Sequence, residues 1–268
     1  MVEADPRTRV RLDLSYDGTG FSGWATQPER RTVQEVVEGA LATVLRVPSV
    51  ALTVAGRTDA GVHAIGQVAH TALDGPPDAR LVARLAGVLP PDVRVTELRR
   101  VPAAFHARFA ALWRRYEYRI SDRPTGADPL RRRFVLDHRR RLDETAMAQA
   151  ASTLVGLHDF AAFCRHRDTG TTIRSVQAFA VERDATGELV VRIQADAFCH
   201  SMVRSLVGAL IAVGEGRRPA SWATRLLDAT SRSNEVTVVA PHGLTLVEVG
   251  YPPADQLAAR AAVTRARR

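Results

Sequence analysis

The chain has 268 residues, of which 46% are hydrophobic and 25% charged, as in folded globular proteins with one large domain or two small ones. Its 37 basic residues are all arginine, and they exceed 29 acidic residues to give a net charge of +8. The absence of lysine excludes Schiff-base chemistry and a phosphate-loop lysine. The arginine excess favours a polyanion such as RNA as partner, although codon composition could produce the same bias.

Two further features concern the compartment. No apolar run approaches the length of a membrane span, and the first residues lack the basic-then-apolar order of a signal peptide. Cys164 and Cys199 are the only cysteines, so a framework of several disulfides is excluded. We therefore expect no membrane association and a reducing, cytoplasmic environment.

The first half of the chain predicts the order strand, helix, strand, strand, helix, strand. Apolar residues alternate in the first strand, and Thr32 with Glu35 forms a capping box before the first helix. Asp78 begins the second helix, which Pro90 stops. The predicted elements are a strand over 10–16, a helix over 33–44, strands over 51–55 and 65–71, a helix over 78–89 and a strand over 93–101.

The same order returns in the second half. The predicted elements are a strand over 112–120, a helix over 143–156, hairpin strands over 173–183 and 188–198, helices over 201–213 and 222–227, and strands within 236–249. In the strand over 112–120, Tyr116 and Tyr118 share one face with Ile120, and Arg115, Glu117 and Arg119 share the other.

These patterns predict an α+β fold of two tandem split βαβ halves, with antiparallel sheets and helices on one side. We assign residues 1–104 to an N-terminal half, 105–252 to a C-terminal half and 253–268 to a basic tail. The repeat is one of element order, not of residue identity. A central cleft between the halves is the expected place for an active site.

Residues 131–141 form a dense basic segment with six arginines around an apolar centre. Such a run is either a solvated face or a surface that grips a nucleic-acid backbone. The sequence leaves both interpretations open.

The strongest candidate site is the turn between the strands over 51–55 and 65–71. Gly56 and Gly61 bracket Arg57 and Asp59, so the backbone can turn sharply and present both side chains at a strand end. Asp59 could merely cap its own turn. It could also serve as a catalytic carboxylate.

The helix over 201–213 is apolar nearly all the way round, so we expect it to be buried on most sides. Arg204 lies within it and cannot lose its proton, so it requires a carboxylate partner. Asp59 is one candidate partner, and Asp196 and Glu215 compete with it.

Tyr116 is either a core residue with a satisfied hydroxyl or a platform on which a base stacks. Metal sites are not indicated, since His63 and His70 are seven residues apart and the zinc deaminase pattern is absent. No dinucleotide fingerprint, phosphate loop or serine-hydrolase motif occurs. We expect neither a metal nor another cofactor.

Four segments resemble the tRNA pseudouridine synthase A family: Tyr16–Trp24, Ala55–Ala64, Phe105–Ile120 and Phe198–Leu210. The resemblance is in register from about Val10 to Tyr251, and Gly-Arg-Thr-Asp-Ala-Gly-Val-His is its most specific part. It implies a cofactor-free enzyme that isomerises uridine to pseudouridine at tRNA positions 38 to 40, in the anticodon stem-loop. It also implies a homodimer in which both subunits contact each tRNA.

The resemblance also assigns residue roles. Asp59 matches the catalytic aspartate, and Arg57 matches an arginine that occupies the space of the flipped base. Tyr116 matches a tyrosine stacked on the target uracil. Arg204 matches an arginine paired with the catalytic carboxylate.

Two other functions fit the same residues. A non-catalytic RNA-binding protein would use the basic surface without any chemistry at Asp59. A base-removing glycosylase would use a similar carboxylate but release free uracil.

Overall fold

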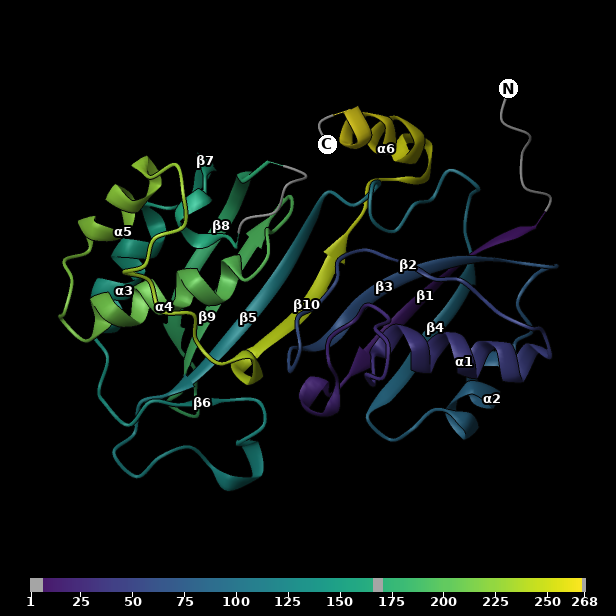
Figure 1. Cartoon of the computed structure of the whole chain (residues 1–268), viewed down its shortest axis with the longest axis horizontal. Coiled ribbons are helices and arrows are strands. Elements are labelled where there is room, and N and C mark those ends of the chain that lie inside the picture. Colours follow the sequence, from purple (N-terminus) through teal and green to yellow (C-terminus); the bar gives the residue numbers. More distant parts are fainter. Residues whose placement is uncertain (1–6, 166–170, 267–268) are drawn as a thin grey trace. The chain divides into compact units, whose positions relative to one another are not determined.

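The computed structural model describes residues 7–165 and 171–266, and the chain divides into two compact units (Figure 1). The first unit comprises residues 1–112 and 248–268, and the second comprises residues 113–247. Within the described ranges, none of the helices combines the length and apolar character needed to cross a membrane.

The first unit is built on an antiparallel sheet in which β1 lies between β3 and β4, with β2 paired to β3. Helices α1 and α2 pack together, and α2 contacts β4 (Figure 1). The elements are β1 (Thr8–Tyr16), α1 (Val33–Leu45), β2 (Thr53–Val54), β3 (His63–Leu73), α2 (Leu81–Val88), β4 (Val93–Arg100) and α6 (Leu257–Ala266).

The local sequence explains these elements. The alternating residues of β1 are buried on one face, with Leu12 opposite Ala69 of β3 and Leu98 of β4. Thr32 occupies the N-cap of α1 as predicted, but its hydroxyl makes no capping hydrogen bond. The hydroxyl oxygen is buried and has no partner among the described residues, so the capping-box interpretation is wrong in its side-chain contact.

The second unit repeats the arrangement, with β9 between β5 and β8 and with β7 on the far edge of β8. Helix α3 packs against β8 and α4. The elements are β5 (Trp113–Ser121), β6 (Leu136–Asp137), α3 (Glu144–Ser152), β7 (Gly156–Asp159), β8 (Ile173–Arg183), β9 (Leu189–Ala195), α4 (Met202–Gly214), α5 (Ser221–Arg225) and β10 (Leu244–Gly250).

The structure confirms the α+β fold with two antiparallel split βαβ arrangements. It shortens two predicted elements. The helix predicted over 143–156 ends at Ser152, and Gly156, at φ +129°, opens the unpredicted strand β7. Of the strands predicted within 236–249, only β10 forms.

The division between the units lies between residues 112 and 113, whereas the sequence places it at 104 and treats 253–268 as a separate tail. Contacts made by the C-terminal residues explain the difference. The Leu112 N–H donates to Gly250 O (2.8 Å), the Tyr251 hydroxyl donates to Ala107 O (2.7 Å), and Arg260 donates to Ala111 O (3.3 Å). Residues 105–112 and the described part of the C-terminal segment therefore fold with the first unit.

The two cysteines are bonded to each other. Cys164 follows a short 3₁₀ helix over Ala161–Phe163 and Cys199 precedes α4, and their Cα atoms are 5.7 Å apart. This separation is typical of a disulfide. The sequence excludes a framework of several disulfides, and the structure contains one bridge, within the second unit.

Candidate active site

The candidate catalytic loop connects β2 to β3 in the first unit and carries both Arg57 and Asp59. The Ala55 N–H donates to Val68 O (2.8 Å) where the loop leaves the sheet, and the Val62 N–H donates to Asp59 O (3.2 Å) within its turn. Asp59 is half-buried and Arg57 is exposed. The loop therefore presents a carboxylate and a guanidinium from one strand end, as the glycine spacing predicts.

A second segment, residues 16–24, holds this loop through its backbone. The Trp24 N–H donates to Thr58 O (3.0 Å), and the Gly61 N–H donates to Phe21 O (3.3 Å). Trp24 itself is only 1% exposed. The two stretches that carry the family resemblance in this half of the chain thus contact each other.

Two glycines of that segment make the close approach possible. A Cβ on Gly18 would overlap the carbonyl of Val62. Gly23 has φ +94°, and a Cβ there would lie 2.9 Å from Thr58 O. Any side chain at either position would push the Asp59 loop out of place.

A buried polar network lies beneath the loop. The Tyr16 hydroxyl bonds to Thr58 Oγ1 (2.8 Å), and Gln67 Nε2 donates to Tyr16 Oη (3.1 Å) and to Gly56 O (2.9 Å). Burial raises the pKa of Tyr16 to about 12, and the hydrogen bonds from Thr58 and Gln67 oppose that rise. Tyr16 is therefore neutral, and together with Gln67 it fixes the part of the turn before Asp59.

The sequence reasoning missed this network. Its available signal was Gln67, a fully buried amide in the otherwise apolar centre of β3. Buried amides are normally hydrogen-bonded, so Gln67 should have been expected to hold a neighbouring loop.

Tyr116 lies on β5 in the second unit, opposite Ile193 of β9, and is 8% exposed. Its ring meets the Phe198 ring edge to face, with 5.2 Å between the centroids and 90° between the planes. Its neighbour Tyr118 donates its hydroxyl to Ala240 O (2.8 Å), and burial raises the pKa of Tyr118. The predicted inward face of β5 is confirmed.

Arg204 is the half-buried exception on α4, whose other residues from Met202 to Gly214 are buried. Its Nε donates to Val239 O (2.8 Å). The expectation of a guanidinium enclosed by an apolar helix is therefore corrected, because the side chain leaves the helix toward the loop that contains Val239.

The two competing partners of Arg204 are engaged elsewhere. Asp196 Oδ1 accepts the N–H groups of Ser175 and Ala197. Glu215 pairs with His138 at 3.2 Å and also contacts Arg140 and Arg217.

The structure thus joins Arg57 and Asp59 in one loop of the first unit. Tyr116 and Arg204 both belong to the second unit, on β5 and α4 respectively. The described ranges contain no group of three or more His, Cys, Asp or Glu side chains arranged to hold a metal ion.

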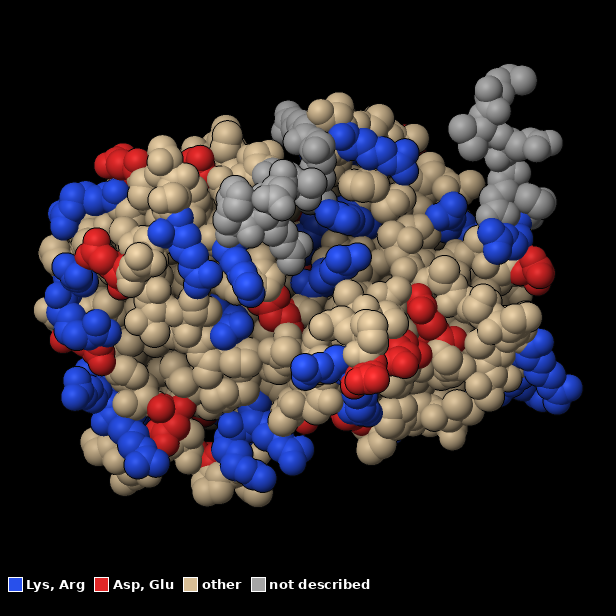
Figure 2. All heavy atoms as spheres, in the orientation of Figure 1, with Lys and Arg blue, Asp and Glu red and all other residues tan. Residues whose placement is uncertain are grey.

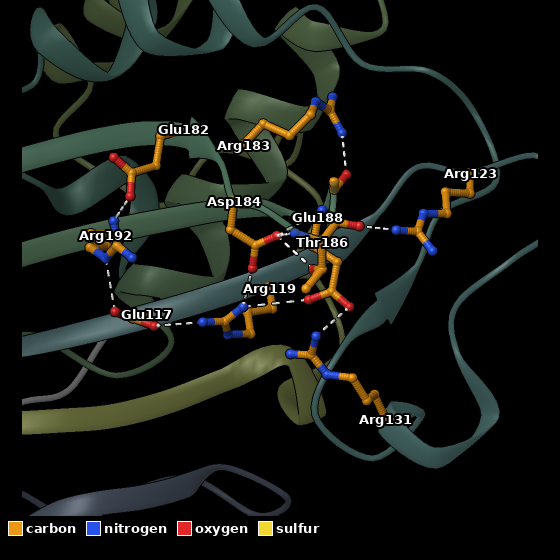
Figure 3. Close-up of polar contacts among 11 residues, drawn as sticks. Glu117, Arg119, Arg123, Arg131, Glu182, Arg183, Asp184, Thr186, Glu188 and Arg192 are labelled. Carbon is orange, nitrogen blue, oxygen red and sulfur yellow. Dashed lines mark hydrogen bonds and ion pairs between the residues drawn. The ribbon is translucent and has the colours of Figure 1, made fainter.

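The basic segment over 131–141 is largely paired within its own unit. Arg131 binds Glu188 (3.0 Å), Arg139 binds Asp137 (2.9 Å) and Arg141 reaches Asp122 (3.4 Å). Figure 3 shows Arg131 entering a wider network on the ends of β5, β8 and β9. Three of the segment's six arginines therefore have a local carboxylate in these pairs.

That network joins arginines and carboxylates from three strands (Figure 3). Arg119 binds Asp184 at 2.8 Å and Glu188 at 3.4 Å. Arg192 binds Glu117 at 2.8 Å and also pairs with Glu182. Burial raises the pKa of Asp184, but hydrogen bonds from Thr186 and Arg119 outweigh it and lower that pKa to about 2.

The amino-acid sequence of this chain is similar to that of a known protein family. A family model described as tRNA pseudouridine synthase matches residues 14–110 and 150–252. Arg57, Asp59 and Arg204 lie within the matched ranges, and Tyr116 lies between them.

Three curated relatives named tRNA pseudouridine synthase A match over nearly their whole lengths. The protein from Frankia casuarinae is 59% identical over 98% of this chain and 96% of its own. The Streptomyces griseus protein is 57% identical over 98% and 95%. The Cutibacterium acnes protein is 53% identical over 97% and 95%.

Proposed function

The chain belongs to the tRNA pseudouridine synthase family and is an isomerase that acts on tRNA, and from this premise we propose that Asp59 is its catalytic carboxylate. The substrate uridines are those at positions 38 to 40 of the anticodon stem-loop. The enzyme works in the cytoplasm as a homodimer whose two subunits contact one tRNA.

The reaction is an isomerisation, so its atoms balance without a co-reactant. The C1′–N1 bond breaks, the uracil turns, and a C1′–C5 bond forms; N1 gains a proton and C5 loses one. A carboxylate suits this sequence because it can hold one fragment as a covalent adduct or stabilise a glycal-type intermediate. Both attack at the sugar and attack at the base are consistent with Asp59.

The other candidates act on the RNA. The target base must leave its stack at a cost of a few kcal/mol, and Arg57, exposed on the same loop, fills the space that it vacates. Tyr116 stacks on the uracil and assists loss of the C5 proton. Arg204 pairs with Asp59 and keeps it ionised.

The observation that carries the proposal is the anchoring of the Asp59 loop. Backbone hydrogen bonds from residues 16–24 and the buried Tyr16–Thr58–Gln67 network fix the loop from two sides. A half-buried carboxylate on a rigid turn is what positioning of a reacting group requires.

Product analysis on an unmodified tRNA transcript tests the proposal. We expect pseudouridine at one or more of positions 38 to 40 with the wild-type protein, and a loss of at least about a thousandfold in rate with Asp59→Asn. Binding of the transcript by Asp59→Asn controls for folding. Unchanged RNA from the wild type would indicate a binding protein, and abasic sites would indicate a glycosylase.

A double-mutant cycle tests the role of Arg204. If Arg204 acts by holding Asp59 ionised, Arg204→Met should reduce the rate strongly in the wild-type background and have little further effect in Asp59→Asn. A fully active Arg204→Met protein would contradict the pairing. Sedimentation of the free protein and of its tRNA complex tests the homodimer.

A further inference from the structure

The first unit contains a cavity of about 260 Å³ that is formed in part by its C-terminal helix. Arg9 of β1, the loop after β4 and helix α6 provide its walls. On α6, Ala258, Ala261 and Arg265 are three and four residues apart, so they share one face. The small alanines leave space that larger side chains would fill, and Arg265 borders that space.

The charged groups of this cavity are all positive among the described residues that line it. Neither Arg9 nor Arg265 forms an ion pair with any carboxylate in the described part of the chain. Arg265 lies over the Phe109 ring, with 5.2 Å to the centroid. Figure 2 shows arginine spheres lying over α6 on the viewed face.

Burial, and after it the neighbouring arginines, lower the pKa values of two histidines here. Burial lowers the pKa of His106 to about 4, and Arg265 and Arg9 lower it further. Behind it, burial and then Arg9 lower the pKa of His70 to about 3. The rings are 4.9 Å apart, and both are therefore neutral at pH 7.

The orientation of His106 makes it a donor. Its Nδ1 accepts the N–H groups of Phe109 (3.1 Å) and Arg108 (3.3 Å). A neutral ring that accepts at Nδ1 carries its proton on Nε2. The cavity is thus lined by two arginines and by a histidine whose ring can donate from Nε2.

Such a donor set suits a phosphate, whose oxygens accept from arginine forks. Stacking of a base is disfavoured, because Phe105 is only 3% exposed and already contacts the Tyr251 ring at 4.9 Å and the His70 ring at 6.0 Å. We propose that the cavity bounded by Arg9, His106 and Arg265 binds a backbone phosphodiester of the RNA substrate.

This inference rests on the proposed tRNA substrate, and it gives the C-terminal helix a role in holding that RNA. A phosphate contact carries no sequence information, so it would position the tRNA rather than select the uridine. The site lies entirely within the first unit.

Salt dependence of tRNA binding tests it. Arg9→Gln and Arg265→Gln should each weaken tRNA binding and reduce the slope of log Kd against log salt. The double variant, which loses the one phosphate contact, should reduce the slope by about 1 and weaken binding about eightfold at 0.1 M salt. Arg99→Gln is the matched control, because Arg99 belongs to the same unit and already contacts Glu97 at 3.6 Å. Slopes equal to the wild type in both cavity variants would overturn the proposal.

A second experiment does not depend on catalysis. Oligoadenylate contains no uridine, and its binding in the cavity should raise the His106 pKa, followed by NMR and assigned with His106→Gln. The Arg9→Gln, Arg265→Gln double variant should show no such rise. If inorganic phosphate raises the pKa but oligoadenylate does not, the site holds a small anion and the RNA proposal is overturned.

The two proposals can fail separately. Loss of pseudouridine formation in Asp59→Asn decides the reaction. The salt slopes and the His106 pKa decide the cavity.

Discussion

Two groups of arginines differ in what surrounds them. On the strands β5, β8 and β9 of the second unit, Arg119 and Arg192 lie among carboxylates at 2.8 Å (Figure 3). In the first unit, Arg9 and Arg265 border a cavity whose described lining contains no carboxylate. The arginines of the first group are paired with carboxylates. Those of the second group have no carboxylate beside them in the described cavity lining, so their positive charge can attract an anion from outside the protein.

The comparison shows that net charge does not locate a binding surface. The excess of +8 could reside anywhere on the chain, and in the densest arginine run, over 131–141, three of the six arginines already pair with nearby acids. An arginine that already has a carboxylate partner neutralises little phosphate charge, so it releases few of the cations condensed on the nucleic acid. Sparse arginines without acidic neighbours are the better candidates for RNA contacts.

The largest expected effect comes from removing Asp122, a buried carboxylate of the second unit that pairs with Arg183. Asp122 is fully buried and receives Arg183 through two hydrogen bonds of 2.9 and 3.0 Å, together with the Leu142 N–H. Asp122→Ala should destabilise the second unit by about 3 to 5 kcal/mol, because it removes the main carboxylate partner of Arg183 and, among the described residues, leaves only Glu144 at 3.5 Å. Urea denaturation measures the loss.

Asp137→Ala is the control for this experiment. Its partner Arg139 has a 72% exposed side chain, so the variant should lose less than about 1 kcal/mol. Equal losses in the two variants would show that burial does not distinguish the pairs.

The next effect is a difference in acid sensitivity. The pKa of His106 falls from 6.5 to about 4 on folding and that of His70 falls to about 3. Below pH 6.5 the unfolded chain binds these protons and the folded chain does not. Stability from this region is therefore fully present above pH 6.5 and is lost as the pH falls toward 3.

The network around Asp184 in the second unit should lose stability only at lower pH. Asp184 has its pKa lowered from 3.8 to about 2, so its contribution persists above about pH 4 and is lost between pH 4 and 2. Amide hydrogen exchange of β3 and β9 against pH should show the first unit weakening first. If β3 and β9 lost protection at the same pH, the expected difference in acid sensitivity between the two units would be wrong.

The smallest effect is expected from the paired arginines in RNA binding. Arg131→Gln should change the Kd for tRNA by less than about twofold and leave its salt slope unaltered, because Arg131 already binds Glu188. Filter binding alongside Arg265→Gln measures both. A larger loss of tRNA affinity in Arg131→Gln would show that the segment over 131–141 contacts the RNA.

Much of the fold follows from local periodicity. The strands β1 and β8 and the helix α4 were predicted nearly to the residue, because alternation and helical spacing act over neighbouring positions. The strands β6 and β7 have two and four residues, which is too short to show a period. Their formation depends on pairing with distant strands.

The candidate site also has parts that the local sequence predicts and parts that depend on distant residues. The turn at Asp59 was predictable because glycines mark it locally, but the support from Tyr16 joins residues 42 and 51 positions apart. A helical wheel gave the burial of α4 correctly and the burial of Arg204 wrongly. A helical wheel does not show that a residue distant in sequence, here Val239, can accept a hydrogen bond from a long side chain and draw it away from the helix.

The contact of Gly18 and Gly23 with the Asp59 loop has a consequence for engineering this protein. Because bare backbone meets bare backbone there, the shape of the turn depends on two missing methyl groups as well as on the buried Tyr16–Thr58–Gln67 network. Libraries that aim to redirect the enzyme to other nucleotides should leave both glycines untouched, even where they vary Arg57 to change its contact with the RNA.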